Sequence, residues 1–195
     1  MSLTFEEETH TYRWKGVTVP SVTQILGPLT DYSKIPVDKL EIARQKGVAV
    51  HKMVELHSKG DLDEEALPEW MRPILGQWKK FVADTGFVVI FSEHQVYNPS
   101  YGYAGTFDLY GEMRDGDAII DVKRSFFAGS VIGLQLAGYQ TAIVSTLKMA
   151  GQAKRYALRL NENGPYRLEE FADKKDFGDF VTALAFWKLQ RRISA

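Results

Sequence analysis

GTFDLYGEMRDGDAIIDVK, the stretch from Gly105 to Lys123, decides the fold because it has the pattern of a β-hairpin. Two runs rich in apolar residues flank the turn residues Arg114 to Asp117. Within the turn, Asp115-Gly116 supplies the positive φ angles that a tight connection between antiparallel strands requires. The sequence therefore predicts two adjacent strands with a turn at Asp115-Gly116.

The acidic and basic residues of this stretch are predicted to meet on one surface. Side chains alternate between the two faces of a strand, so Thr106, Asp108 and Tyr110 are expected to share one face of the first strand. By the same rule, Asp121 and Lys123 share one face of the second strand. Two carboxylates and a lysine would then lie close together.

Such a cluster needs partners, because the apolar residues on both sides of Asp121 indicate an interior strand, where unpaired charge is costly. A magnesium-like cation would supply them through hard oxygen ligands: the carboxylates of Asp108 and Asp121 and the backbone carbonyl of Val122, with Lys123 beside it. An isolated Asp-x-Lys is a weak signal, since pairs at this spacing are commonly surface salt bridges.

Length and composition bound the classes of protein to consider. The chain has 195 residues, of which 45% are hydrophobic, and this suits one domain over residues 1–195. Residues 1–85 are predicted to form an N-terminal hairpin with a helical elaboration, and residues 86–195 the sheet core. The net charge is −1, so any affinity for nucleic acid must come from a local patch.

The residue types that are missing narrow the chemistry and the compartment. There is no cysteine, which excludes disulfides, thiolate zinc sites and cysteine-ligated iron–sulfur clusters. No stretch resembles a signal peptide or a membrane span, because the apolar runs are only a few residues long. We therefore expect a cytoplasmic protein with no membrane partner.

The rest of the chain alternates between helical and extended patterns. The strand at 87–97 and the two strands of the hairpin are expected to form an antiparallel meander. A helix at 130–148 can act as a crossover that places the next strand parallel to one strand of the meander. The predicted fold class is α/β, a mixed central sheet flanked by helices. The other predicted elements are a hairpin at 4–19, helices at 22–26 (with Ser21 as N-cap), 36–58, 67–84 and 173–192, and strands at 152–160 and 166–171.

Several short motifs together resemble those of the PD-(D/E)XK nuclease superfamily, and within it the RecB-like exonucleases of phage and mitochondrial type. The resemblance extends from about Ser21 to about Tyr139. It rests on Ser-Val-Thr at 21–23, Gly-x-x-x-His ending at His51, Gly-Thr-Phe-Asp ending at Asp108, Asp-Val-Lys at 121–123, and Gln-x-x-x-Tyr from Gln135 to Tyr139. Each motif is short, but their order and spacing make a specific combination. The resemblance implies a restriction-endonuclease-like core.

The resemblance also implies a role for each matching residue. His51, Asp108, Asp121 and the Val122 carbonyl would be metal ligands. Lys123 would hold or deprotonate the attacking water, or stabilise charge on the phosphate. The residues expected to act in catalysis are Asp108, Asp121, Lys123, Gln135 and Tyr139, the last two by orienting the site or contacting DNA. An auxiliary acid is expected at Glu93.

Other polar residues are candidates for supporting roles. Glu55 lies one helical turn after His51 and could orient its ring. The candidate contacts to nucleic acid are Arg44, Lys46, Lys52, Arg124 and Ser125. Aromatic residues that could stack on bases, although core packing is the simpler expectation, are Trp14, Tyr32, Trp70 and Trp78. Considered singly, a histidine such as His51 is more often an ordinary hydrogen-bonded residue than a metal ligand, and Gln135 and Tyr139 would be an ordinary pair on a helix.

The chemistry of phosphodiester hydrolysis fits the predicted cluster. The reaction needs an activated nucleophile and compensation for charge on the phosphate, and a divalent cation supplies both. Carboxylate oxygens suit Mg²⁺ or Mn²⁺, whereas one histidine without cysteine disfavours zinc.

The sequence therefore predicts a metal-dependent DNA exonuclease that acts on single strands or duplex ends, in DNA repair, recombination or phage DNA processing. A recombination protein or a single-strand-binding protein is the expected protein partner. The alternatives are a structure-specific endonuclease and a non-catalytic nucleic-acid-binding module on the same fold.

Overall fold

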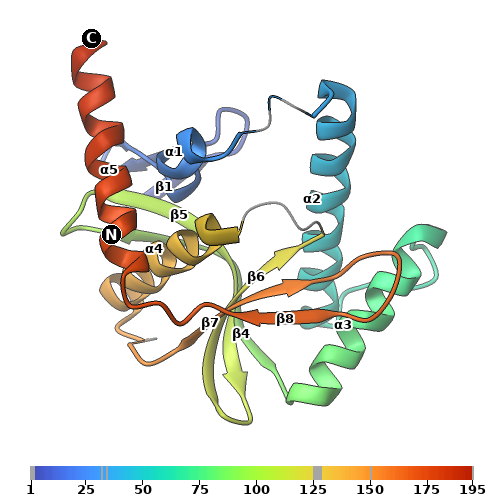
Figure 1. Ribbon diagram of the computed structural model, residues 1–195. Coiled ribbons are helices and arrows are strands. Elements are labelled where there is room, and N and C mark those ends of the chain that lie inside the picture. Colours follow the sequence, from blue (N-terminus) through green and yellow to red (C-terminus); the bar gives the residue numbers. More distant parts are fainter. Residues whose placement is uncertain (1–2, 32, 34, 125–128, 150, 195) are drawn as a thin grey trace.

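The computed structural model describes residues 3–31, 33, 35–124, 129–149 and 151–194, and within them the fold is α/β (Figure 1). A small sheet has the strand order β1-β2-β3, and a larger mixed sheet has the order β4-β5-β6-β7-β8. The strands are β1 (Leu3–Glu6), β2 (Thr11–Trp14), β3 (Val17–Val19), β4 (Val88–Asn98), β5 (Tyr103–Met113), β6 (Gly116–Lys123), β7 (Lys154–Arg159) and β8 (Arg167–Glu170). The helices are α1 (Val22–Leu26), α2 (Val37–Lys59), α3 (Arg72–Thr85), α4 (Gly129–Leu147) and α5 (Asp176–Ile193), with short 3-10 turns η1 (Gly27–Leu29) and η2 (Glu69–Met71).

The large sheet has the predicted topology. Strands β4, β5 and β6 form an antiparallel meander, and α4 crosses over so that β7 pairs parallel to β6. The chain then turns back, and β8 pairs antiparallel to β7. Strand β6 therefore lies inside the sheet, with a neighbour on each side, as its apolar sequence predicts.

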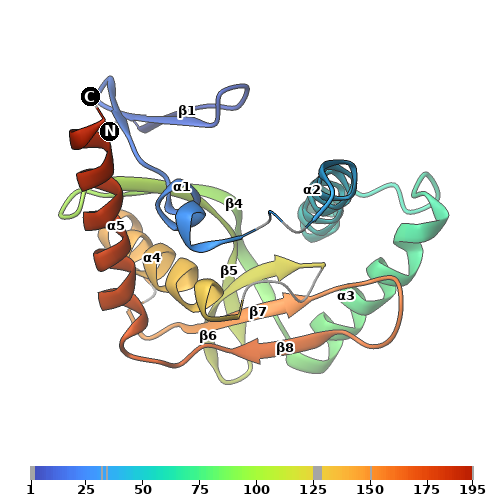
Figure 2. The ribbon, with the colours of Figure 1, turned by 45° about the horizontal axis from the view of Figure 1, so that its top comes forward.

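Helices cover both faces of this sheet, as Figure 2 shows. On one face, α1, α4 and α5 pack in a core that includes Ile119 and Phe180. On the opposite face, α2 and α3 pack in a second core that includes Ile120 and Trp78. Adjacent residues of β6 thus serve different cores, and this strand is the element that both layers share.

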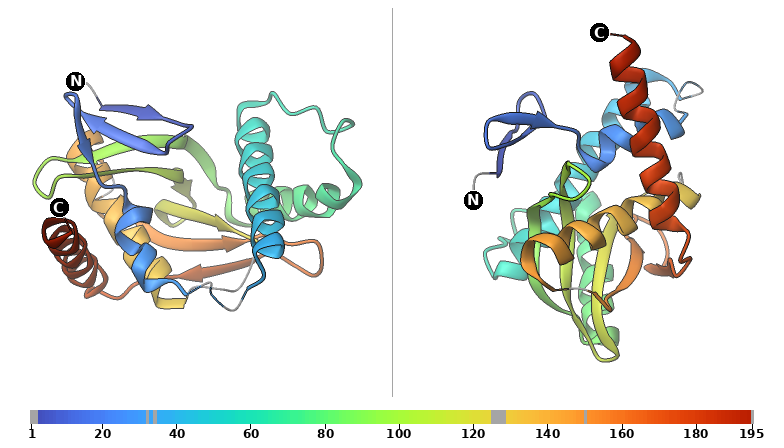
Figure 3. Two further views of the ribbon diagram at one scale, coloured as in Figure 1. Left: turned by 90° about the horizontal axis from the view of Figure 1, so that it is seen from above. Right: turned by 90° about the vertical axis from the view of Figure 1, so that its left-hand side faces the viewer.

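The small N-terminal sheet lies next to β4 and β5 (Figure 3). The Trp14 ring stacks on Tyr97, with ring centroids 4.2 Å apart and planes 17° apart. The hydroxyls of Tyr12 and Thr106 are 2.7 Å apart, within hydrogen-bond distance. Pro20, which follows the small sheet, also contacts β5, because the Ala104 amide donates a hydrogen bond to the Pro20 carbonyl. The small sheet and Pro20 are therefore attached to β4 and β5 of the meander.

Helix α1 begins as predicted. The Ser21 hydroxyl accepts a hydrogen bond from the Gln24 amide, and the Gln24 side chain in turn accepts one from the Ser21 amide. This reciprocal arrangement is a capping box, which satisfies amide donors that the helix itself leaves unpaired.

Three local predictions differ from the structure. Residues 4–19 form three strands, because a turn before Thr11 with His10 at φ +49° adds to the predicted turn at Lys15-Gly16. The helix predicted at 67–84 is divided into η2 and α3. In the hairpin turn, the positive φ belongs to Gly116 (+121°) and not to Asp115.

No helix among the described residues is both long enough and apolar enough to cross a membrane.

Candidate metal and active site

Strands β5 and β6 separate at the end that carries the acids. Their backbone pairing runs from Met113–Gly116 to Leu109–Ile120, and within the described ranges it does not continue further. Beyond that point the Asp108 carboxylate accepts a hydrogen bond of 2.6 Å from the Val122 amide. The Asp108 side chain thus takes the place of the next backbone pair. This hydrogen bond holds the carboxylate between the two strands.

The predicted alternation of faces fails at the same point. Phe107 and Tyr110 both lie in the core against α4, although they are three residues apart, while Leu109 lies in the core against α2 and α3. The expectation that Thr106, Asp108 and Tyr110 share one face is therefore wrong, because regular alternation is interrupted around Asp108.

Strand β4 is irregular directly opposite Asp108. Ser92 pairs with Leu109 and His94 with Phe107, but Glu93 between them has a φ of +47°. This left-handed conformation costs a residue with a Cβ about 1–2 kcal/mol. In this conformation the Glu93 carboxylate faces the imidazole of His51.

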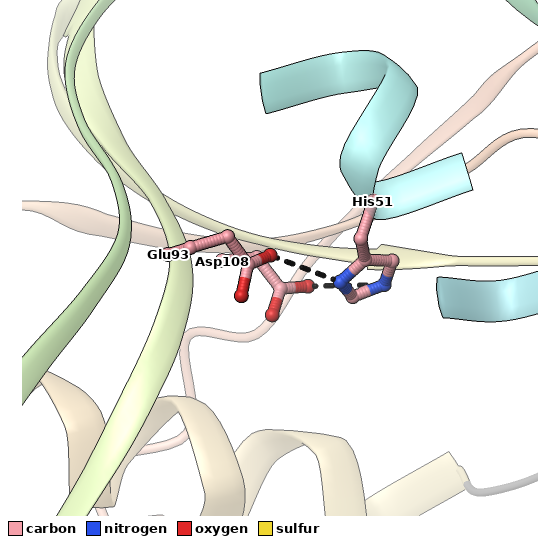
Figure 4. Close-up of side chains that lie close together, drawn as sticks. All are labelled: His51, Glu93 and Asp108. Atoms are coloured by element: carbon pink, nitrogen blue, oxygen red, sulfur yellow. Dashed lines mark hydrogen bonds and ion pairs between the residues drawn. The ribbon is translucent and has the colours of Figure 1, made fainter. Parts of the chain in front are cut away.

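His51 on α2 completes a cluster with Glu93 and Asp108 (Figure 4). Its Nδ1 lies 3.2 Å from Glu93 Oε1, and its Nε2 lies 2.9 Å from the Val122 carbonyl oxygen and 3.6 Å from Asp108 Oδ2. One potential ligand atom from each of His51, Glu93 and Asp108 lies within 4.8 Å of the others. Together with the Val122 carbonyl, these donors could hold a metal ion.

The electrostatics show why a cation suits this cluster. Burial lowers the pKa of His51, but the charges of Asp108 and Glu93 outweigh it and raise the pKa to about 9. The protonated ring can donate from both nitrogens, which both face acceptors. Burial also raises the pKa of Asp108, although His51 and Lys123 oppose the shift. The imidazolium therefore supplies the positive charge that these carboxylates need, and a divalent cation would supply more of it.

Asp121 lies beside Lys123, as predicted, and also contacts Gln135. Its carboxylate is buried, with Oδ2 2.8 Å from Lys123 Nζ. Its Oδ1 accepts a 3.0 Å hydrogen bond from the side-chain amide nitrogen Nε2 of Gln135. Burial raises the pKa of Asp121 to about 6, while Lys123 acts to lower it. Asp121 is thus held by Lys123 and Gln135 beside the His51, Glu93 and Asp108 cluster. Glu93, predicted only as an auxiliary acid, is a member of that cluster.

Tyr139 closes the floor of the site. It is buried against β5, where a Cβ at Gly105 would approach its ring carbon Cε1 to 2.7 Å. Gln135, one turn earlier on α4, hydrogen bonds to its hydroxyl. Burial raises the Tyr139 pKa well above its usual value. The phenol therefore keeps its proton and lies next to Gln135, which contacts Asp121.

The predicted partner of His51 was wrong. Glu55 pairs with Lys52 at 2.9 Å and with Lys59 at 2.5 Å, and the carboxylate that contacts the imidazole ring is Glu93. Glu55 still lines the same small pocket as His51 and Asp108.

The predicted nucleic-acid contacts divide into two groups. Lys46 and Arg124 converge on Glu162, an acid that sequence reasoning did not identify. Arg44 instead pairs with Glu41 on an exposed face of α2, and Lys52 pairs with Glu55. Ser125 lies outside the described residues. Glu162 carried no signal, because its partners are far away in sequence and it sits in an ordinary turn.

The candidate stacking residues also have different environments. Trp78 is in the core, where its indole N–H donates to His57, and Trp14 packs on Tyr97. Trp70 lies beneath two cations, Lys46 and Arg124. Tyr32 lies outside the described residues.

No model of a protein family matches the chain, and no curated protein matches it. Among solved structures, the chain is similar to an alkaline exonuclease from Laribacter hongkongensis, with 11% identity, a TM-score of 0.48, and coverage of 90% of this chain and 89% of that one. The same exonuclease in complex with dAMP gives 10% identity and a TM-score of 0.42 over 90% and 89% of the two chains.

A putative exonuclease from Eubacterium rectale is similar at 12% identity and a TM-score of 0.46, over 72% of this chain. This chain spans 64% of the length of that protein. The structural neighbours named here are thus exonucleases, at low sequence identity and moderate structural similarity.

Proposed function

We propose that this protein is a DNA exonuclease that hydrolyses phosphodiester bonds of single-stranded DNA or of duplex ends with Mg²⁺ or Mn²⁺. The observation that carries the proposal is the convergence of His51, Glu93 and Asp108 beside the paired side chains of Asp121 and Lys123. Four elements, α2, β4, β5 and β6, deliver these groups to one point. An ordinary surface ion pair would not need such an arrangement.

The donor set favours an oxygen-preferring cation. Two carboxylates, one backbone carbonyl and a single imidazole match the ligands of Mg²⁺ or Mn²⁺ better than those of zinc. When bound, the cation would make water more acidic and compensate negative charge on the phosphate. His51, Glu93, Asp108 and the Val122 carbonyl would hold it, and Asp121 is proposed as a further ligand.

The neighbouring residues would act on the substrate directly. Lys123 would present its ammonium group to the phosphate or to the attacking water, and Asp121 fixes its position through the 2.8 Å contact. Gln135 holds Asp121 from the other side. Arg44, Lys46, Lys52, Arg124 and Ser125 are proposed to contact the strand. Such an enzyme would serve DNA repair, recombination or phage DNA processing, together with a recombination or single-strand-binding protein.

The test is cleavage of linear single-stranded and duplex DNA carrying a 5′ or a 3′ label, with Mg²⁺, with Mn²⁺ and with EDTA. Asp108→Asn should reduce cleavage by about a hundredfold or more, because metal ions contribute several kcal/mol to such reactions. Asp115→Asn makes the same change at the exposed tip of the same hairpin and should leave cleavage intact.

Undiminished cleavage by Asp108→Asn would contradict the assignment of Asp108 as a metal ligand of the nuclease. Cutting of circular single-stranded DNA would identify an endonuclease. DNA binding that persists in EDTA, without cleavage in any divalent metal, would identify a non-catalytic binding module.

A further inference from the structure

Four side chains from separate segments meet beside the candidate site. Lys46 belongs to α2, Trp70 to η2, Arg124 follows β6, and Glu162 lies between β7 and β8. Lys46 Nζ is 4.7 Å from the centroid of the Trp70 ring, and Arg124 Cζ is 5.4 Å from it. Both cations also contact the same carboxylate oxygen, Glu162 Oε1, at 2.9 and 2.8 Å.

The positive charge in this group exceeds the negative charge. Two cations share one carboxylate, and the Trp70 ring attracts them without neutralising them. Within the described part of the chain, Arg124 Nε is buried and has no hydrogen-bond acceptor. The group therefore has more donors than the single Glu162 oxygen can satisfy, which is the condition for binding an anion with several oxygens.

The position of the group relates it to the candidate active site. Arg124 directly follows Lys123 in sequence, and Lys46 precedes His51 by five residues on the same helix. Five residues of α-helix span about 7.5 Å along the axis. Side chains of adjacent residues leave a strand on opposite faces, so Lys123 and Arg124 flank the end of β6. A DNA strand that crosses this end would meet both residues.

We propose that Lys46 and Arg124 bind a phosphodiester group adjacent to the one being cleaved, and that the Glu162 carboxylate occupies this place until the strand displaces it. This inference rests on the proposed nuclease function and specifies its substrate contact. A phosphodiester presents more oxygens to the guanidinium than the shared Oε1 does, and it can bind Arg124 in a bidentate manner. Trp70 keeps both cations in position during the exchange. Glu162 thus weakens DNA binding.

The test measures binding of a fluorescent 5′-hydroxyl oligonucleotide, whose phosphates are all phosphodiesters, by anisotropy in EDTA. Glu162→Gln should bind about three- to tenfold tighter, because it removes two competing ion pairs, each worth up to about 1 kcal/mol. Its salt dependence should be steeper by about 0.7 in the slope of log K against log salt, the value for one phosphate contact on a single strand.

Two comparisons separate local competition from a general change in charge. Glu64→Gln removes an equal charge from another ion pair between segments, with Lys79 at 2.6 Å, and should change affinity by less than about twofold. Lys46→Ala should weaken binding, and Glu162→Gln should gain less in that background, where it releases Arg124 alone. Circular dichroism of each variant establishes that it is folded.

Equal or weaker binding by Glu162→Gln overturns the inference, as does a gain of undiminished size in the Lys46→Ala background. If the wild-type protein cleaves DNA while Glu162→Gln binds it no more tightly, only this inference fails. If the wild-type protein neither binds nor cleaves DNA, the proposed function fails with it.

Discussion

At the scale of single residues, His51 carries the positive charge of a site rich in acids. Its protonated ring bridges Glu93 and the Val122 carbonyl and lies near Asp108. A metal ion that uses the same donors has to displace the proton from the ring. Metal binding and protonation of His51 are therefore in competition.

This competition predicts how Mg²⁺ affinity depends on pH. Since the pKa of metal-free His51 is about 9, the ring is protonated at pH 7 and loses its proton as the pH rises through 9. Mg²⁺ affinity should increase by about ninefold from pH 7 to 8 and about fivefold from pH 8 to 9, and level off above, because one proton is released. Calorimetry at pH 7, 8 and 9 measures it. His51→Ala should abolish the slope, and a slope unchanged in that variant would contradict the prediction.

Glu93 is predicted to maintain the charged state of His51. Removing its charge in Glu93→Gln should lower the His51 pKa, because the carboxylate both accepts a hydrogen bond from the ring and attracts its charge. The measurement is an NMR titration of the histidine side chains. His57 serves as an internal control, since burial and Lys79 lower its pKa. An unaltered His51 titration would count against the contact.

Sequence reasoning reached part of this site. His51, Asp108 and Gln135 came from motif order, and the structure brings each of them to the site. Glu55 seemed the natural partner of His51 because spacing of four places residues on one helix face, but spacing does not determine which way a side chain turns. The prominence of Glu93 was not predictable, because it depends on a left-handed residue within a strand.

At the scale of elements, the helices and strands with strongly periodic sequences were predicted well. The crossover helix and the parallel pairing of β6 with β7 followed from the order of strand and helix signals. The separation of β5 from β6 was not predictable, because it replaces a backbone pair by a side-chain contact that leaves no periodic signal. The extra turn in the N-terminal sheet was missed because its polar residues fit a longer loop equally well.

Packing of α4 on β5 predicts the effect of Gly105→Ala. The added methyl would lie 2.7 Å from Tyr139 Cε1 and 3.3 Å from Val22 Cγ2, so buried side chains must shift. We expect a loss of about 1–3 kcal/mol in the free energy of unfolding, measured in urea.

The matched control is Gly47→Ala in α2, where the added methyl meets nothing within 4 Å. It should stabilise the protein by about 0.5–1 kcal/mol, because alanine favours the helix interior. A neutral Gly105→Ala would show that Tyr139 has room to move.

At the scale of the whole molecule, β6 joins the two cores. Ile119 packs toward α4 and α5, whereas Ile120 packs toward α2 and α3. Loss of either core would expose one face of the same strand. We therefore expect the two layers to unfold together.

Ile119→Val and Ile120→Val should each lower the free energy of unfolding by about 0.5–1.5 kcal/mol, because each leaves a small cavity in one core. Both variants should keep a single transition in which tryptophan fluorescence and far-ultraviolet circular dichroism coincide. Two separate transitions in either variant would show that the layers unfold independently.

The interior place of β6 also has a consequence for the nascent chain on the ribosome. The Leu160 amide donates to the Lys123 carbonyl, and β7 lies along the whole acid-bearing end of β6. At about 5–20 residues per second, translation from Lys123 to Leu160 takes roughly two to seven seconds. During that interval the chain carries its acids without the strand that completes their sheet, so the proposed activity would begin only after Leu160 has emerged.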